Sequence, residues 1–336
     1  MTEQDKTIEL SPVKPNFKQL PSVFAIALEQ FGAIELVGEE QSKYLQGQVT
    51  CDVLKLTDEQ VVTGAHCNAK GKLFSVFRLL NRNNSHLLIQ PKVTIANSLA
   101  ELKKFGVFAK VDIEQTEQFS FWAIAGQDSE QFLSQHFDQI PNSLSPVVQQ
   151  GPLTLIYIAG NVKRYLLISD NNDAVAAIIG QNAMPIYQHQ VWDLLEIIEG
   201  FANFQQPTAD DYVPQMLNLQ AIDGISFTKG CYLGQETVAR MQYLGRNKRA
   251  LFSLVGQVES NEANDESFAT VEQQLGENWR RAGDVISYYR ADDGTTYLQA
   301  VLASDIANDT KLRLKHLPES EFTLEPLPYS LDQDGK

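Results

Sequence analysis

A short segment near residue 230 combines a thiol, a lysine, two glycines and a carboxamide–carboxylate pair. Its residues are Lys229, Gly230, Cys231, Tyr232, Leu233, Gly234, Gln235 and Glu236. The glycines permit tight backbone geometry, and Gln235 starts a stretch typical of a helix. The positive end of a helix and a nearby lysine both favour a reactive thiolate. The segment therefore predicts a functional thiol at Cys231. The alternative is a small buried hydrophobe in a glycine-shaped turn.

The same part of the chain is locally basic. Residues 229–249 hold five cations, Lys229, Arg240, Arg246, Lys248 and Arg249, against the single acid Glu236, which gives +5 − 1 = +4. The whole chain has a net charge of −15. This contrast predicts a site for an anionic group, such as the glutamate tail of a folate or a phosphate. A solvated face near a domain junction is the alternative.

Three residues elsewhere could serve a flat heteroaromatic ligand. A pterin carries hydrogen-bond donors and acceptors on its rim, so its pocket needs a stacking ring and a carboxylate. Phe31, Trp192 and Glu199 could supply these groups. Tryptophan is most often a core residue, so Trp192 alone indicates little.

The elements that must position these residues follow from hydrophobic periodicity and turn signals. We expect a strand, a glycine, a helix and a strand meander, followed by a second copy of that order, which predicts an α+β fold. The first copy comprises strand 31–37, a helix opening at Gly38, the meander 61–90 and a helix 98–105. The second comprises strand 119–125, a helix from Gly126 to 132 and a hairpin of 153–158 with 165–169.

The last third of the chain changes character. Residues 249–256 alternate in polarity, and two apolar runs flank Asp292-Asp293-Gly294. An Asp-Gly between alternating runs is a strong hairpin signal. We therefore expect a small antiparallel β-barrel after a boundary near residue 245. The expected division is a disordered N-terminus (1–16), folate-binding α+β structure (17–48 with 114–245), an inserted α+β subdomain (49–113) and the barrel (246–330).

Composition narrows the functional class. Of 336 residues, 43% are hydrophobic and 21% charged, as in globular proteins. The three cysteines form no paired motif and the five histidines show no zinc-like spacing, so we expect no metal site. The N-terminus has acids and no apolar core of a signal peptide, and the apolar runs are strand-sized. We therefore expect a cytoplasmic protein that does not enter a membrane, and a monomer by default.

The segment 229–236 matches K-G-C-Y-x-G-Q-E, the hallmark of the YgfZ family, which is related to the glycine-cleavage aminomethyltransferase. Eight consecutive residues of such unusual composition make this match specific. The resemblance covers about residues 22–330 and includes further similar segments at 44–50, 65–72, 218–221, 224–227, 247–251 and 325–330.

The resemblance implies three domains around a central opening, the last a β-barrel, and binding of a tetrahydrofolate-type folate in that opening. It implies an accessory role in maintaining iron–sulfur enzymes, including those that thiolate tRNA, with a link to replication initiation. The hallmark cysteine maps onto Cys231. The pterin-contacting aromatics map onto Phe31 and Trp192. The other residues expected at the folate site are Glu199, Lys229, Tyr232, Gln235 and Arg240.

Two departures bear on function. The family's I-E-A-G becomes Ile197-Ile198-Glu199-Gly200, and on a strand a one-residue shift would reverse the face of the acid. Aminomethyltransferases carry a catalytic Asp pair after the first meander, and Phe74-Ser75 stand there in this chain. We therefore favour a folate-binding accessory protein over a tetrahydrofolate-dependent aminomethyl or one-carbon transferase. Direct tRNA binding is a third hypothesis, which the net charge opposes.

Overall fold

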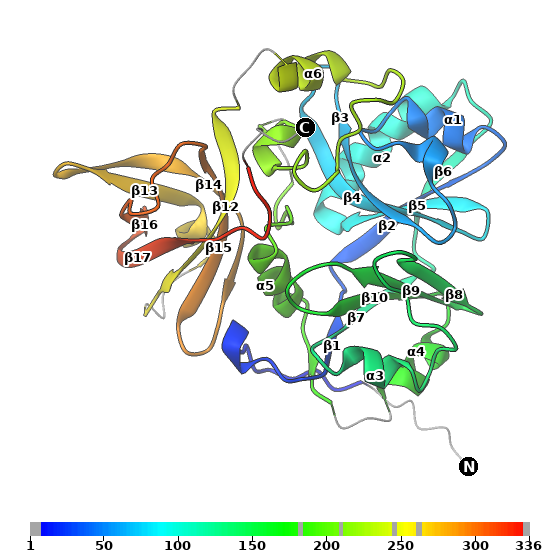
Figure 1. The fold of residues 1–336 in the computed structure, drawn as a ribbon, viewed down its shortest axis with the longest axis horizontal. Helices are drawn as coiled ribbons and strands as arrows, with labels where there is room; N and C mark the ends of the chain where they lie inside the picture. The colour runs from blue at the N-terminus through cyan, green and yellow to red at the C-terminus, as the bar shows by residue number, and fades with distance from the viewer. Residues whose placement is uncertain (1–7, 181–183, 208–210, 244–246, 260–263, 332–336) are drawn as a thin grey trace.

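The fold is built on three sheets. The computed structural model describes residues 8–180, 184–207, 211–243, 247–259 and 264–331. Figure 1 shows the barrel on one side, the two open sheets on the other and helix α5 between them. The architecture is therefore mixed α+β, with a C-terminal six-stranded antiparallel barrel.

The first open sheet has five strands in the order β3-β4-β5-β2-β6, and it is antiparallel throughout. Helix α2 packs on it through Ile95 and Leu102. Its strands are β2 (Phe31–Val37), β3 (Val61–Cys67), β4 (Leu73–Arg82), β5 (Ser85–Pro91) and β6 (Asp112–Thr116), and its helices are α1 (Gln41–Gln46) and α2 (Lys92–Gly106).

The second open sheet has six strands in the order β11-β1-β7-β10-β9-β8. The β9–β10 pair is the expected hairpin, with Leu155 opposite Leu167. Its strands are β1 (Phe24–Ala27), β7 (Ser120–Ala125), β8 (Val147–Gln150), β9 (Leu153–Ile158), β10 (Arg164–Ser169) and β11 (Ile186–Tyr187), and its helices are α3 (Ser129–Leu133) and α4 (Asn172–Ile179).

The barrel closes in the order β12-β15-β14-β13-β16-β17. Gly294, with φ +84°, makes the Asp-Gly turn that joins β14 to β15. The strands are β12 (Arg249–Gln257), β13 (Thr270–Leu275), β14 (Asn278–Arg290), β15 (Thr295–Ala303), β16 (Leu312–Leu314) and β17 (Leu317–Glu325). Short 3-10 turns complete the chain at η1 (Phe17–Gln19), η2 (Val53–Lys55), η3 (Pro214–Leu217) and η4 (Asp265–Phe268), and α6 (Gln235–Tyr243) precedes the barrel.

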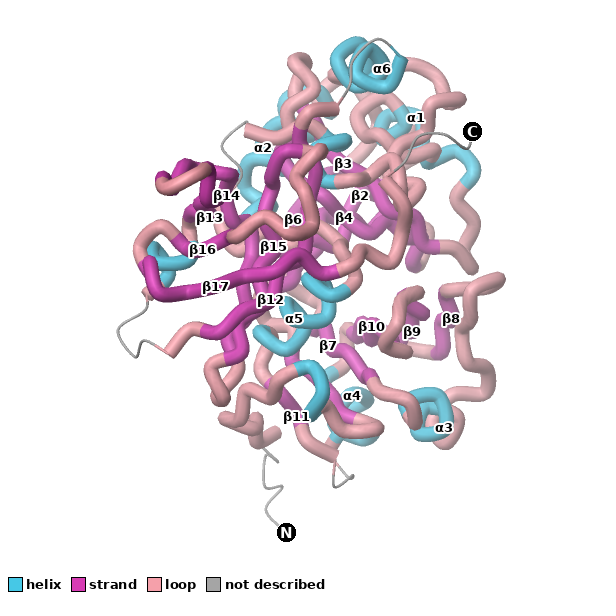
Figure 2. The backbone as a smooth tube through the Cα atoms, turned by 60° about the vertical axis from the view of Figure 1, so that its left-hand side comes forward, coloured by secondary structure: helices cyan, strands magenta, loops and turns pink. Residues whose placement is uncertain are grey.

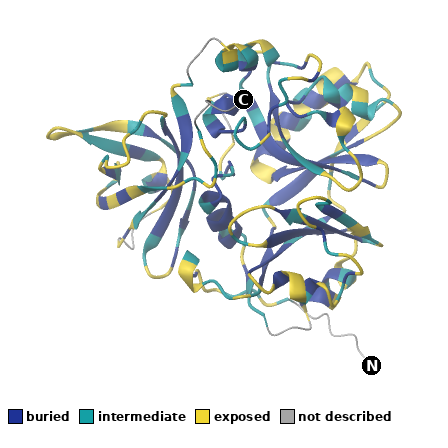
Figure 3. Cartoon of the chain, in the orientation of Figure 1, coloured by how far each residue is buried: buried dark blue, intermediate teal, exposed yellow. Residues whose placement is uncertain are grey.

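Helix α5 (Gln190–Ile198) lies where the three sheets meet. Every residue from Val191 to Ile197 is buried, including Asp193 and Glu196, and Figure 3 shows the helix as a dark band. One hydrophobic cluster joins α5 to both open sheets and to Tyr289 and Tyr297 of the barrel. The other residues of this stretch are apolar, and a helix that is apolar on nearly all sides belongs in the interior. The tube in Figure 2 shows α5 between the barrel strands and β7.

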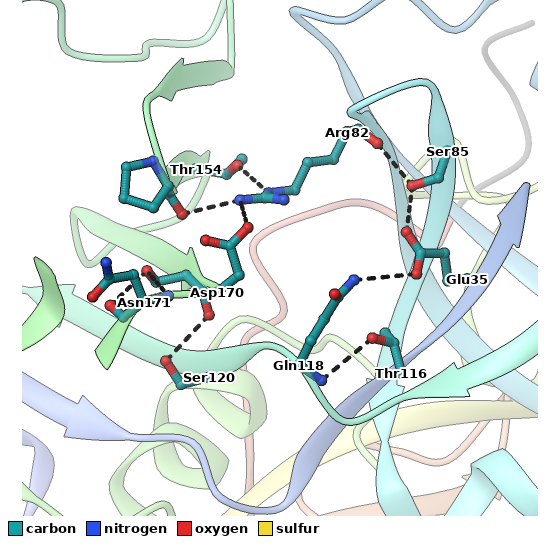
Figure 4. A network of polar contacts seen from close by, with 11 residues as sticks. Glu35, Arg82, Ser85, Thr116, Gln118, Ser120, Thr154, Asp170 and Asn171 are labelled. Carbon is teal, nitrogen blue, oxygen red and sulfur yellow. Dashed lines mark hydrogen bonds and ion pairs between the residues drawn. The ribbon is translucent and has the colours of Figure 1, made fainter. Parts of the chain in front are cut away.

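A polar network also fastens the two open sheets together (Figure 4). Arg82 of β4, 3% exposed, donates from Nε to Thr154 Oγ1 at 3.1 Å and from Nη2 to Asp170 Oδ2 at 2.9 Å. Glu35 accepts hydrogen bonds from the Ser85 hydroxyl and the Gln118 amide. A buried arginine with its donors paired fixes the angle between the sheets.

Most of the expected elements are confirmed, with shifted ends. The first helix begins at Gln41 rather than Gly38, and the helix ending at Gly106 begins at Lys92. The strands 31–37 and 61–90 are those expected. The boundary near 245 lies outside the described residues.

The expected domain division stays a prediction. Residues 17–48 are expected to fold with 114–245, and residues 49–113 to form an inserted subdomain. In the structure, β2 pairs with β5, which lies inside 49–113, and with β6, at the end of that segment. Of the expected disordered segment, residues 1–7 lie outside the described part. Within residues 8–16, Ser11 pairs with Tyr187, and Asn16 caps η1 and donates to Asp293.

Candidate functional site: a clamped thiol segment and a polar cavity

Lys229 anchors the segment 229–236 to a distant loop. Its Nζ donates to the carbonyl oxygens of Gln46, Val49 and Cys51, each at 2.7 Å. A lysine ammonium has three protons, so all of its donors are used. Burial lowers the pKa of Lys229 to about 8. The geometry gives Lys229 a holding role and leaves it no proton for a ligand.

Cys231 is exposed, and the chain around it is shaped by glycine. Gly234 has φ +82°, and a Cβ there would lie 2.5 Å from the Asn68 carbonyl oxygen and 2.9 Å from Gly71 Cα. A Cβ at Gly230 would meet nothing within 4 Å. The expected helix, α6, begins four residues after the thiol. The segment therefore presents Cys231 to solvent on a backbone held firmly at Lys229 and Gly234.

The other residues near the thiol that were expected to bind folate or an anion make different contacts. Tyr232 is buried, with Lys229 Nζ 5.2 Å from its ring centroid. Gln235 is half-buried at the start of α6. Arg240 is exposed and donates to Glu236 at 3.3 Å. Arg249 donates to the Val301 carbonyl on β15, and Arg246 lies outside the described residues. The described cations thus do not gather around one anion site.

A cavity of about 450 Å³ lies at the other end of β3. Its wall includes Thr63, Arg78, Arg164, Glu199, Phe201 and Tyr329. Cavities of this size hold small organic ligands. The chain reaches it from β3, β4, β10, the end of α5 and the segment after the barrel, so segments more than 200 residues apart meet at one site.

Glu199 gives this cavity an unpaired acceptor. Its Oε1 accepts the backbone N–H groups of Asn161 and Val162, while Oε2 has no partner although the residue is only 7% exposed. The residue is the C-cap of α5. The expectation that a strand would place this acid was therefore wrong, because the segment is the end of a helix.

Three buried charged residues, Arg78, Arg164 and Glu196, pair with one another near Glu199. Glu196 accepts hydrogen bonds from Arg78 Nη2 and Arg164 Nη1 at 2.8–3.0 Å. The Arg78 guanidinium lies 3.8 Å from the Phe201 ring centroid. Buried charges are tolerated only when they are paired in this way. Both arginines belong to the wall of the cavity, which therefore combines cationic side chains with the free carboxylate oxygen of Glu199.

Trp192 and Phe31 lie behind the wall of this cavity. Trp192 is fully buried, and its ring packs edge to face with Phe31 at 6.2 Å between centroids. Arg164 lies 4.7 Å from the Trp192 ring centroid. The tryptophan therefore supports the arginine that faces the cavity, and neither ring belongs to the wall beside Glu199.

The thiol and the cavity are far apart. Val61 to Thr63, at the start of β3, line the cavity, whereas the far end of β3 lies at the thiol segment, where Val49 pairs with His66. At 3.3 Å per residue, β3 spans about 20 Å. Figure 1 shows α6 at the top of the molecule and α5 near its centre. The structure does not bring Cys231 together with Glu199.

Sequence reasoning did not single out Arg78, Arg164 or Glu196. A signal was present, because Arg78 interrupts the apolar strand β4 and Glu196 interrupts the apolar helix α5. Charges in apolar runs indicate buried ion pairs. The partners lie 32 and 118 residues apart, so only the fold identifies them. Among the described residues, no group of three His, Cys, Asp or Glu side chains could hold a metal ion, and no helix is long and apolar enough to span a bilayer.

Comparison with known proteins decides the family. Residues 247–316 match the YgfZ β-barrel domain. The tRNA-modifying protein YgfZ of Colwellia psychrerythraea is 54% identical over 97% of this chain and 99% of its own length. The chain belongs to the YgfZ family. The protein of that name from Yersinia enterocolitica is 41% identical over 92% of this chain and 93% of its own.

The YgfZ fold is shared with a glycine-cleavage protein. The crystal structure of aminomethyltransferase T from Bartonella henselae superposes with a TM-score of 0.68 at 12% identity, covering 91% of this chain and 86% of that one. At that identity the likeness concerns the fold alone. The expected membership of the YgfZ family and the expected likeness in fold to the aminomethyltransferase are confirmed.

Proposed function

We propose that this chain is a cytoplasmic, folate-binding accessory protein that supports iron–sulfur enzymes and, through them, tRNA modification. Its relatives are named as tRNA-modifying proteins. The observation that carries the proposal is the separation of an exposed thiol from a polar cavity by the length of β3. Such an arrangement suits a thiol that acts on another protein.

The cavity beside Glu199 fits the pterin of a folate. Glu199 Oε2 lacks a donor, and the amino and ring N–H groups of a pterin are donors. Arg78 and Arg164 can donate to the ring carbonyl and to the anionic tail. Phe201, which also lines the cavity, supplies an aromatic wall. A bound tetrahydrofolate would supply one-carbon carrier chemistry at this place. Of the residues expected from sequence, Glu199 is the direct ligand and Trp192 acts through Arg164.

The transferase alternative has less support. Phe74 and Ser75 replace the catalytic acids, and Ser75 is fully buried beneath α2, where its hydroxyl donates to Ser98. Neither side chain is a carboxylate that could position a folate nitrogen. Lacking such a group typically lowers a rate by about 10²–10⁴-fold. A role in replication initiation remains an implication of the resemblance.

Two variants test the two halves of the proposal separately. Glu199→Gln keeps the shape but removes the charge that accepts the pterin donors, so folate affinity should fall about tenfold in a fluorescence titration. Cys231→Ser should leave that affinity unchanged but fail to restore thiolated tRNA in a deletion strain.

The outcomes are distinct. Restoration of thiolated tRNA by Cys231→Ser would remove the thiol from the function. Unchanged folate affinity in Glu199→Gln would move the folate away from this cavity. Cys67→Ser, at a cysteine that is buried in β3, is the control for effects of cysteine removal on folding.

A further inference from the structure

A second cavity, of about 590 Å³, lies between the start of α5 and the barrel, at the end of the helix opposite to Glu199. Its wall includes Gln30, His189, Gln190, Asp193, Ser287 and Tyr288. It shares none of its lining residues with the cavity beside Glu199. The two are therefore separate cavities, one at each end of α5.

The barrel faces α5 with a row of three polar side chains on neighbouring strands. Ser253, Gln299 and Ser287 are paired across β12, β15 and β14. Ser253 Oγ donates to the Ile197 carbonyl, and Gln299 Nε2 donates to the Phe201 carbonyl at 2.9 Å. Ser287 adjoins a β-bulge after Val285, and its hydroxyl has no partner although the residue is 1% exposed. Two members of the row hold the end of α5 and the segment after it, and the third belongs to the lining of the cavity.

Further unpaired polar groups line the same cavity from other elements. Both amide atoms of Gln30, in the turn between β1 and β2, are buried without a partner, as is Oε1 of Gln190 at the start of α5. A buried hydroxyl or amide without a partner destabilises a fold. Three such groups from three parts of the chain belong to the lining of one cavity, and a ligand bound there would pair them.

Apart from Lys14, which is exposed, the charged groups of the cavity are already engaged. Asp193 accepts hydrogen bonds from Asn203 Nδ2 at 2.6 Å and Gln205 Nε2 at 2.9 Å. Asp265 accepts the Tyr288 hydroxyl at 2.5 Å. Arg290 donates to the Val258 carbonyl, and burial lowers the pKa of His189, which favours the neutral ring. The buried groups that remain are neutral and include both donors and acceptors.

We propose that this cavity binds a small neutral ligand with alternating donors and acceptors on its edge, as in a cyclic amide. The Ser287 hydroxyl and the Gln30 amide would pair with that edge. The Phe268–Tyr288 pair, stacked at 4.1 Å between centroids, forms an aromatic part of the wall. The proposal does not depend on folate binding at the other cavity.

The test uses the full chain with uracil and uridine as probes, followed by saturation-transfer NMR and calorimetry. Ser287→Ala should weaken binding about 3–10-fold, the equivalent of one hydrogen bond. It should leave the melting temperature unchanged or raise it, since an unpaired buried hydroxyl is removed. Ser253→Ala is the matched control. It should lower the melting temperature, because the Ile197 carbonyl loses its donor, but leave uracil affinity unchanged.

Gln30→Leu gives an independent second variant, which should weaken uracil binding at least as much as Ser287→Ala. Absence of binding up to the solubility limit of both probes would overturn the proposal. So would equal affinity in the wild type, Ser287→Ala and Gln30→Leu, or equal binding of benzoate, an anionic ring without N–H donors. Glu199→Gln should leave uracil affinity intact, which separates this site from the folate site.

Discussion

Replacing Lys229 by methionine tests whether this lysine is a structural clamp. Methionine keeps most of the apolar stem but removes the three donors to Gln46, Val49 and Cys51. Each buried carbonyl left without a donor costs about 1 kcal/mol at the low end of the usual range, or about 3 kcal/mol for three. The variant does not have to bury an ammonium, and the desolvation cost that is saved offsets part of this loss of stability. We expect a net loss of about 2 kcal/mol.

The measurement is the free energy of unfolding from urea titration, followed by tryptophan fluorescence. Lys72→Met is the matched control, because Lys72 is half-buried and its ammonium donates to a single carbonyl, that of Asp211, in exposed surroundings. It should cost less than about 0.5 kcal/mol, as surface changes usually do. Folate affinity should be unchanged in both variants. If Lys229→Met were no more destabilising than Lys72→Met, or if it lost folate binding while remaining folded, the clamp interpretation would be refuted.

Two further predictions concern glycine and pH. Gly234→Ala should lower the free energy of unfolding by about 1–3 kcal/mol, because the position has a positive φ and a Cβ there would meet fixed backbone atoms. Gly230→Ala should change that free energy by less than about 1 kcal/mol. Equal unfolding midpoints for the two variants would contradict this prediction. Burial raises the pKa of Asp193 from 3.8 to about 7. Between these pH values the native state binds more protons than the unfolded state, so the free energy of unfolding falls as pH rises, by on the order of 4 kcal/mol in total. In Asp193→Asn, a flipped Asn203 amide can accept a hydrogen bond from the new amide, and the dependence of the free energy of unfolding on pH should be lost. Parallel curves of stability against pH for the wild type and this variant at pH 4–8 would contradict this prediction.

The sequence determined the local features of this protein. Alternating polarity and an Asp-Gly turn specify the hairpin of β14 and β15. The meander of β3, β4 and β5 follows from apolar runs and turn residues for the same reason. The hallmark segment, with Cys231 before a helix, was also visible, because eight neighbouring residues carry it.

Only the tertiary structure decided what the functional residues contact. By its residue type Lys229 was expected to bind an anion, but its ammonium donates all three hydrogen bonds to carbonyls about 180 residues away. By its residue type Trp192 was expected to stack on a pterin. The three sheets enclose α5, however, and the Trp192 ring packs against Arg164 instead. Hydrophobic period and turn chemistry act over a few residues, whereas burial and hydrogen-bond partners depend on which elements pack together. Chemistry that depends on those partners therefore cannot be read from neighbouring residues.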